Sequence, residues 1–167
     1  RESGVPIVAI VGYTNAGKST LLNRLSGSSV YAADQLFATL DPVTRRVDLP
    51  GGAEVLFTDT VGFVQKLPPD LVAAFKATLE ELAEADLLLH VVDAADPNLD
   101  RKMDAVGRVL TELELNAIPR LVIMNKADAV APAVLQSLCE RHDAIPVSAL
   151  RREGLDRLLE AAENLLR

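Results

Sequence analysis

The stretch Val8–Thr20 reads VAIVGYTNAGKST, and the fold of the chain follows from it. Its apolar run Val8–Val11 predicts a buried strand. Gly12 and Gly17 end that strand, and from Lys18 onward the apolar residues have the spacing of a helix. The pattern is G-x-x-x-x-G-K-[ST] between a strand and a helix, which is the context of a phosphate-binding loop.

The residue types of this loop suit a nucleotide phosphate. Gly12 and Gly17 admit backbone angles that turn successive N–H groups toward phosphate oxygens. The positive end of the following helix faces the same anion. Lys18 adds charge for the β- and γ-phosphates, and the Ser19 hydroxyl can ligate Mg²⁺. An ordinary glycine-rich turn before a helix would show the same pattern, so the rest of the chain has to decide.

Composition and charge narrow the class of protein. The chain has 167 residues, of which 49% are hydrophobic and 25% charged, and this is typical of one globular domain with a full core. The net charge is −7 and no long basic run occurs, so we expect no autonomous nucleic-acid-binding surface. The single cysteine, Cys139, excludes an intrachain disulfide and a cysteine-cluster metal site.

The ends of the chain and its apolar runs bear on localisation. No apolar run is long enough for a membrane span, and the N-terminal residues do not form a signal peptide, so we expect a reducing, cytoplasmic compartment. The chain starts one strand before the phosphate loop and lacks an initiator Met. We therefore expect residues 1–167 to be a single domain of a longer multidomain protein.

Apolar runs and helical spacings predict an α/β fold with a mostly parallel six-stranded sheet, helices on both faces and one antiparallel hairpin. The turn Pro50-Gly51-Gly52 joins the second and third strands and makes them antiparallel neighbours. Three helical patterns are centred on Leu71–Leu82, Met103–Leu113 and Leu155–Leu165. The predicted strands are Val5–Val11, Thr44–Leu49, Glu54–Thr58, Leu87–Val92, Leu121–Asn125 and Ala144–Val147.

Polar clusters follow four of these strands. In a parallel sheet ligands bind at the carboxyl ends of the strands, so the clusters should share one crevice. The cluster Asp59-Thr60-Val61-Gly62 follows the third strand. Its carboxylate can hold Mg²⁺ through water, and the Gly62 N–H can sense a γ-phosphate. Without the phosphate loop, an Asp that caps the next segment would be the simpler interpretation.

The cluster Asn125-Lys126-Ala127-Asp128 predicts the base. Asp128 can accept hydrogen bonds from the N1–H and 2-amino groups of guanine, whereas adenine has no such donor pair and would leave the carboxylate unpaired. Lys126 would lie along the base plane, and Asn125 would tie the loops together. Ser148-Ala149-Leu150 follows the last strand and allows a backbone contact with the guanine oxygen.

The sequence assigns no specific role in nucleotide binding to the other polar residues. The irregular stretch Val30–Thr44 is long enough to be functional and offers Thr39 and Thr44 as hydroxyls for the Mg²⁺ shell, but the residues alone do not choose between them. His90, inside LLLHVV, is interpreted as a satisfied core histidine. Asp93 and Asp96 are explained by helix capping.

Five short motifs occur in a fixed order along the chain, and longer strings extend several of them. The ordered set GYTNAGKST, FATLDPVTR, DTVGF, NKAD and SAL matches the five nucleotide motifs of translation-factor-class GTPases. The longer strings GYTNAGKSTLLNRL, DQLFATLDPVTRR, DTVGFVQKLPPDLVAAFKATLEE and ADLLLHVVDAADP are similar to those of the HflX family of ribosome-associated GTPases. The resemblance covers essentially the whole chain and implies the Ras-like fold of a P-loop GTPase domain.

The resemblance also implies cofactors, partners and residue roles. It implies GTP and GDP as substrate and product, Mg²⁺ as cofactor and the large ribosomal subunit as partner. It selects Thr39 as the switch hydroxyl, and it implies K⁺ beside the phosphates with Asn15 as its ligand. The predicted catalytic residues are Lys18, Thr39, Gly62 and Asn15, and the predicted Mg²⁺ residues are Ser19, Thr39 and, through water, Asp59. The predicted nucleotide contacts are Gly12, Tyr13, Thr14, Asn15, Ala16, Gly17, Lys18, Ser19, Thr20, Phe37, Ala38, Thr39, Asp59, Thr60, Val61, Gly62, Asn125, Lys126, Asp128, Ser148, Ala149 and Leu150.

One departure from the Ras pattern concerns catalysis. Phe63 follows Gly62, where Ras has the Gln that orients water, and no Lys or Arg lies between Arg24 and Arg45 to act as a cis arginine finger. We therefore expect slow intrinsic hydrolysis. Phe63 also motivates a second hypothesis, a GTP- or GDP-dependent binding module with incidental hydrolysis. The generic motifs alone would also fit a GTPase of ribosome assembly or RNA modification, and the phosphate loop alone would fit an ATPase.

Overall fold

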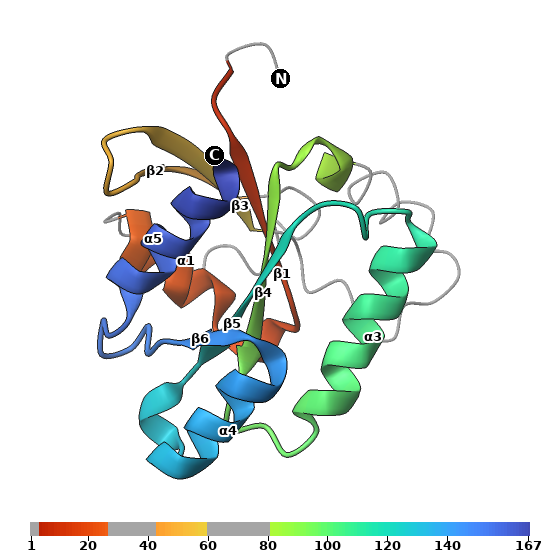
Figure 1. The fold of residues 1–167 in the computed structure, drawn as a ribbon, viewed down its shortest axis with the longest axis vertical. Coiled ribbons are helices and arrows are strands. Elements are labelled where there is room, and N and C mark those ends of the chain that lie inside the picture. The colour runs from red at the N-terminus through yellow and green to blue at the C-terminus, as the bar shows by residue number, and fades with distance from the viewer. Residues whose placement is uncertain (1–3, 27–42, 60–80) are drawn as a thin grey trace.

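A computed structural model of the chain describes residues 4–26, 43–59 and 81–167. Within them, six strands form one sheet in the order β2-β3-β1-β4-β5-β6 (Figure 1). The strands are β1 Ile7–Val11, β2 Val43–Asp48, β3 Glu54–Asp59, β4 Leu87–Asp93, β5 Arg120–Asn125 and β6 Ala144–Pro146. Each predicted strand is confirmed, and the ends differ by at most two residues.

Strand directions follow the predicted pattern. β2 runs antiparallel to β3, and every other neighbouring pair is parallel. The β2–β3 turn closes through backbone hydrogen bonds from Leu49 N to Ala53 O at 2.8 Å and from Gly52 N to Leu49 O at 2.9 Å. The one antiparallel hairpin predicted from Pro50-Gly51-Gly52 is therefore confirmed.

The described residues contain four α-helices, of which three lie between strands and the last follows β6. They are α1 Lys18–Ser26, α3 Leu99–Glu112, α4 Pro132–His142 and α5 Leu155–Leu166, with short 3₁₀ turns η1 Thr14–Ala16, η3 Glu81–Glu84 and η4 Ala127–Ala129. The helical pattern at 103–113 falls within α3 apart from its last residue, and that at 155–165 falls within α5. The helix expected over 71–82 lies outside the described residues except for its last two positions, which fall in η3. Helix α4, which begins with a proline in its first turn, was not among the helical patterns singled out in the sequence.

The helices cover both faces of the sheet because alternate strand residues point to opposite sides. Leu21 and Leu22 of α1 and Leu158 of α5 are buried against one face, in a cluster that includes Ile10 and Phe57. On the other face α3 packs against Ala9, Val11 and Leu88, and α4 packs against Val92 and Met124. Figure 1 shows α3 on the side of the sheet away from α1 and α5. The fold class predicted from sequence is confirmed.

None of the helices in the described part of the chain has the length and apolar character needed to cross a membrane.

His90 of β4 is buried as expected, but it is not satisfied. Its side chain is 2% exposed, and among the described residues its Nδ1 atom has no hydrogen-bond partner. Polar side chains such as Lys102, Arg120 and His142 line the same pockets as His90, but none of the described residues bonds to its Nδ1 atom. Burial, together with the nearby charges of Arg120 and His142, lowers the pKa of His90 from 6.5 to about 3.

We predict that His90 makes the stability of the domain fall in mild acid. Between pH 6.5 and 3 the unfolded chain binds a proton that the native chain excludes, so the free energy of unfolding falls as the pH drops, by up to about 1.4 kcal/mol per pH unit. Urea denaturation at pH 7 and pH 5 should show a loss of about 2 kcal/mol in the wild type. His90→Leu should remove most of this loss.

The control is His142→Gln, since the chain has only two histidines. That variant should keep most of the acid sensitivity, because it leaves His90 buried. An equal loss in the wild type and in His90→Leu would contradict the assignment.

Candidate nucleotide-binding site

The phosphate loop needs glycine at two positions. Gly12 has φ +144°, and a Cβ atom there would lie 2.5 Å from the carbonyl oxygen of Val91 in β4. Gly17 has φ +87°, and its Cβ would lie 2.6 Å from Nδ2 of Asn125. The phosphate loop thus packs closely against Val91 of β4 and against Asn125 at the end of β5. α1 begins directly after it, at Lys18, as the sequence predicted.

Lys18, Ser19 and Asp59 meet at the start of α1. Lys18 is only 4% exposed, and its Nζ lies 3.3 Å from Oδ1 of Asp59. The Ser19 hydroxyl donates to Oδ2 of Asp59 at 3.4 Å. Burial lowers the pKa of Lys18 and raises the pKa of Asp59, and the charge of each partner opposes the other's shift. Phosphate-loop and third-strand residues are therefore in contact, as the topology predicted.

Asn125 joins three segments of the site. Its Nδ2 donates to the carbonyl oxygen of Ala16 at 2.8 Å, and its Oδ1 accepts from the backbone N–H of Ala149 at 3.1 Å. Its own carbonyl accepts from Ala94 N at 2.9 Å. The side chain is 2% exposed. The prediction that Asn125 ties the loops together is confirmed.

Lys126 follows in the left-handed conformation, with φ +66°. Its Nζ donates to the carbonyl oxygen of Asn15 at 2.8 Å and to Oδ2 of Asp93 at 3.1 Å. The ammonium therefore bridges the phosphate loop and the end of β4. Asp93 also accepts from Ala95 N at 2.9 Å.

Asp128 lies in the turn η4 and faces the loop after β6. Its Oδ1 accepts from the Ser148 hydroxyl at 2.7 Å, and its Oδ2 lies 3.9 Å from Nε of Arg151. The Ser148 hydrogen bond is the main cause that lowers the pKa of Asp128. Ser148 and Ala149 are buried, whereas Leu150 is 71% exposed. The fifth-strand and sixth-strand clusters are thus brought together.

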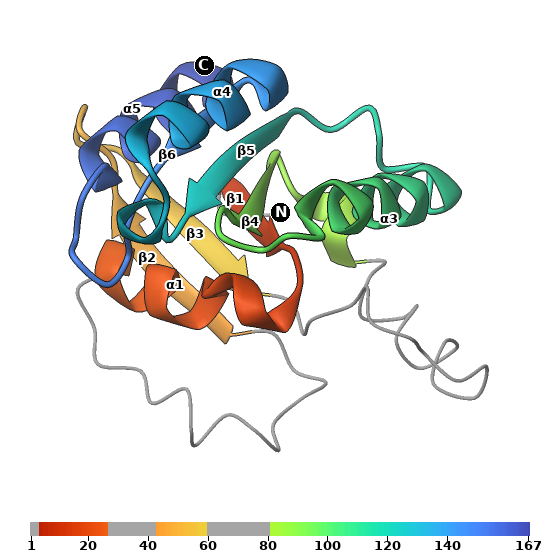
Figure 2. The ribbon, with the colours of Figure 1, turned by 90° about the horizontal axis from the view of Figure 1, so that it is seen from below.

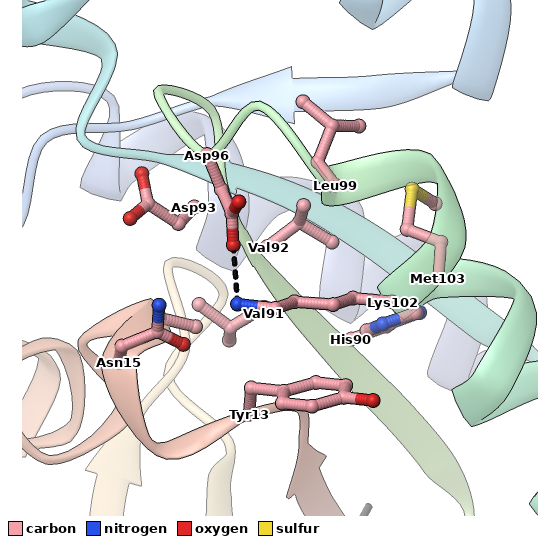
Figure 3. A pocket seen from close by; sticks show the side chains of 11 residues that line it. Tyr13, Asn15, His90, Val91, Val92, Asp93, Asp96, Leu99, Lys102 and Met103 are labelled. Carbon is pink, nitrogen blue, oxygen red and sulfur yellow. Dashed lines mark hydrogen bonds and ion pairs between the residues drawn. The ribbon is translucent and has the colours of Figure 1, made fainter. Parts of the chain in front are cut away.

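A small cavity of about 10 Å³ lies between the phosphate loop and α3, with room for about one water molecule. Figure 3 shows Lys102 of α3 extending across it, between Asp96 and the ring of Tyr13. Lys102 Nζ is 2.5 Å from Oδ2 of Asp96 and 5.0 Å from the centre of the Tyr13 ring. Asn15, another phosphate-loop residue, lines the same cavity.

The capping interpretation of Asp93 and Asp96 was wrong. The residue that caps α3 is Asn98, which makes no side-chain cap hydrogen bond. Asp96 shapes the turn before the helix by accepting from Asn98 N at 2.8 Å, and it pairs with Lys102. Sequence reasoning missed both aspartate–lysine pairs. For the pair of Asp93 and Lys126, the signal was the parallel pairing of β4 and β5, which sets Asp93 beside Asn125.

Some of the remaining predicted residues lie within the described part of the chain, and the others lie outside it. Thr14 lies in η1 and Thr20 is exposed on α1. Thr44, the hydroxyl that the resemblance did not select, lies in β2 with its Oγ1 3.3 Å from Oγ1 of Thr58. The predicted contacts that lie outside the described residues are Phe37, Ala38, Thr39, Thr60, Val61 and Gly62, together with Phe63.

Comparison with known proteins identifies the family. A family model described as 50S ribosome-binding GTPase matches residues 7–126. The chain belongs to that family. The match runs from β1 through the phosphate loop and Asp59 to Lys126, so it includes most of the site described above. It confirms the expectation of a GTPase domain.

The relatives of the chain agree with this assignment. The chain is 53% identical over 166 residues to a GTPase HflX of Caldanaerobacter subterraneus, covering 99% of this chain and 38% of the relative. The chain therefore spans less than half the length of this relative. The resemblance to HflX proteins seen in the sequence is confirmed.

Solved structures show the same fold. A GTP-binding protein from the archaeon Sulfolobus solfataricus, solved in complex with GDP, matches with a TM-score of 0.79 and 29% identity over 96% of this chain and 52% of its own. Era, solved with MgGDPNP and a fragment of 16S ribosomal RNA, matches with a TM-score of 0.74 and 29% identity over 98% of this chain and 57% of its own.

We predict that Gly17→Ala damages the loop more than a matched glycine substitution. The control is Gly52→Ala in the β2–β3 turn, where φ is +97° but a Cβ atom would meet nothing within 4 Å. Both variants carry the cost of a left-handed alanine, about 1 kcal/mol. Only Gly17→Ala must also displace the Asn125 amide, so it should lose more unfolding free energy and most GDP affinity.

Thermal unfolding and fluorescent GDP titration measure the two effects. Equal stability and equal GDP affinity in the two variants would show that the approach of Asn125 to the loop is unimportant.

Proposed function

We propose that this chain is the GTP-binding and GTP-hydrolysing switch domain of an HflX-like protein that works on the large ribosomal subunit. The observation that carries the proposal is the buried Asn125 side chain, which joins the phosphate loop at Ala16 to the loop of Ala149. This contact holds the two loops together, which supports a phosphate site and a base site at one edge of the sheet. Family membership supports the same conclusion.

Asp128 would recognise the guanine base. An aspartate is ionised at neutral pH, and the hydrogen bond from Ser148 lowers the pKa of Asp128 further, so its carboxylate can accept from the guanine N1–H and 2-amino groups. Adenine offers no donor pair there and would leave the carboxylate unpaired, which disfavours an ATPase. Lys126, held by Asn15 and Asp93, would lie along the base plane.

Ser19 and Asp59 fit a Mg²⁺ ion. A hydroxyl and a carboxylate are the oxygen donors that Mg²⁺ prefers, and Asp59 Oδ1 is buried without a well-formed hydrogen bond among the described residues. Ser19 would hold the ion directly and Asp59 through water, with Thr39 completing the shell. The ion, when bound, would offset charge on the β- and γ-phosphates.

Hydrolysis would proceed by attack of water on the γ-phosphorus. The bond from the water oxygen to phosphorus forms, the bond to the bridging oxygen breaks, and GDP and phosphate result. Lys18 and the N–H groups of the phosphate loop stabilise the charge, and the Gly62 N–H would sense the γ-phosphate. We also propose a K⁺ ion beside the phosphates, with Asn15 as its ligand.

Slow intrinsic turnover follows from what the chain lacks. Phe63 stands where Ras has a water-orienting Gln, and no Lys or Arg lies between Arg24 and Arg45. A partner would therefore order the contacts around the γ-phosphate that these residues do not provide. The family description and the similarity to HflX support the large ribosomal subunit as that partner and the cytoplasm as the place of action. The second candidate is a nucleotide-dependent binding module in which hydrolysis is incidental, and Phe63 is the feature that favours it.

We predict that Asp128→Asn changes the base preference from guanine to xanthine. The amide keeps an oxygen for N1–H but replaces the second acceptor with a donor, which suits the 2-oxo group of xanthine. GDP affinity should fall about 100-fold, and XDP affinity should rise above it. Competition against fluorescent GDP measures both values. Asp104→Asn, an exposed aspartate of α3, is the matched control and should change neither.

Phosphate release tests the switch against the binding module. We expect the 167-residue chain with Mg²⁺ to turn over at roughly the unassisted Ras rate, about 10⁻⁴ to 10⁻³ s⁻¹. Large ribosomal subunits should raise this rate about tenfold or more, because a partner can order the contacts around the γ-phosphate. Small subunits at the same concentration are the control. Absence of stimulation would favour the binding module, and a fast rate from the chain alone would contradict the account of Phe63.

A further inference from the structure

Arg24 connects α1 to the loop that follows β6. Its Nε donates to the carbonyl oxygen of Ala149 at 3.0 Å, across 125 positions of sequence. Arg24 is half-buried in the last turn of α1, and Figures 1 and 2 show that this loop passes beside that helix. The contact is with the backbone of the segment Ser148-Ala149-Leu150, so it acts on the position of the loop itself.

Two successive peptide groups of this loop are fixed by different partners. The group between Ser148 and Ala149 is fixed at both ends: its N–H donates to Asn125 Oδ1 at 3.1 Å, and its carbonyl accepts from Glu153 N at 3.0 Å. The next group, between Ala149 and Leu150, accepts from Arg24 at 3.0 Å, and the Arg152 N–H lies further away at 3.4 Å. Arg24 is thus the main anchor of the second peptide group.

We propose that Arg24 is a positioning residue for guanine recognition, which holds the Ala149–Leu150 peptide group so that the Leu150 N–H faces the carbonyl oxygen of the base. The inference rests on the proposed guanine site. A guanidinium is a charged donor, and its hydrogen bond to a carbonyl is stronger than that of a neutral donor. It also polarises the peptide group and makes the N–H on the other side a better donor.

The position of Arg24 gives this contact a second consequence. α1 begins at Lys18, next to the phosphates, and reaches Arg24 less than two turns later. The same rigid helix therefore sets both the phosphate end and the base end of the site. Asn125 links the two ends from the β5 side, and Arg24 links them from the α1 side.

Three nucleotides separate this role from general anchoring. GDP carries the guanine oxygen and the 2-amino group, 6-thio-GDP replaces the oxygen with sulfur, a weaker acceptor, and IDP lacks the 2-amino group. In the wild type, GDP should bind more tightly than either analogue. Arg24→Gln should weaken GDP binding about tenfold. It should also bring the affinity ratio of GDP to 6-thio-GDP close to one, while the ratio of GDP to IDP, set by Asp128, stays unchanged.

The test uses equilibrium competition and unfolding midpoints on the 167-residue chain. Arg24→Lys keeps the charge but loses the planar Nε donor, so the 6-thio ratio should fall less than in Arg24→Gln. Arg46→Gln is the matched control, because Arg46 is 71% exposed and pairs with Glu54 at the far side of the β2–β3 hairpin. It should leave all affinities at their wild-type values.

An equal loss of affinity for all three nucleotides, or an unchanged 6-thio ratio in both folded Arg24 variants, would overturn the inference and make Arg24 a structural anchor only. Failure of the proposed function has a different signature. In that case the wild type itself would bind GDP no more tightly than IDP.

Discussion

The carboxamide of Asn125 is the interaction on which the rest of the site depends. One end donates to the phosphate loop and the other accepts from the loop after β6, and the side chain is almost completely buried. Removing it would leave a backbone carbonyl and a backbone N–H without partners, at a cost of about 1–3 kcal/mol each. It also explains Gly17, because no Cβ atom fits between the phosphate loop and this amide.

The parallel sheet places Asn125 where it can act. β1, β4 and β5 lie side by side in parallel, and their carboxyl ends reach the same edge of the sheet. The register sets Asp93 directly beside Asn125, so the lysine that follows Asn125 meets the carboxylate that ends β4. Lys126 and Asp93 thus form an ion pair although 33 positions separate them in the sequence. The polar residues of the candidate site lie at the strand ends and in the loops that follow them. The hydrophobic core fixes the strand ends from which these loops begin.

The sequence predicted the elements that local patterns encode. Strand positions and directions followed from apolar runs, one glycine turn and the intervening helices, and the tie made by Asn125 followed from the convergence of strand ends. Side-chain pairs between distant elements did not follow. Lys126 with Asp93 and Arg24 with Ala149 depend on how far a long side chain reaches across packed elements. The unpaired nitrogen of His90 belongs to the same class, because an apolar run shows burial but not hydrogen bonding.

Calorimetric titration of the wild-type chain with GDP and with ADP, both in the presence of Mg²⁺, tests most directly whether this assembly is a guanine nucleotide site. Both ligands share the diphosphate, so the phosphate loop contributes equally to both. The difference in their affinities therefore reports the base contacts that Asn125, Asp128 and the Ala149 loop create. We expect GDP to bind at least about 100-fold more tightly than ADP. Equal affinities would contradict the assignment of Asp128 to guanine.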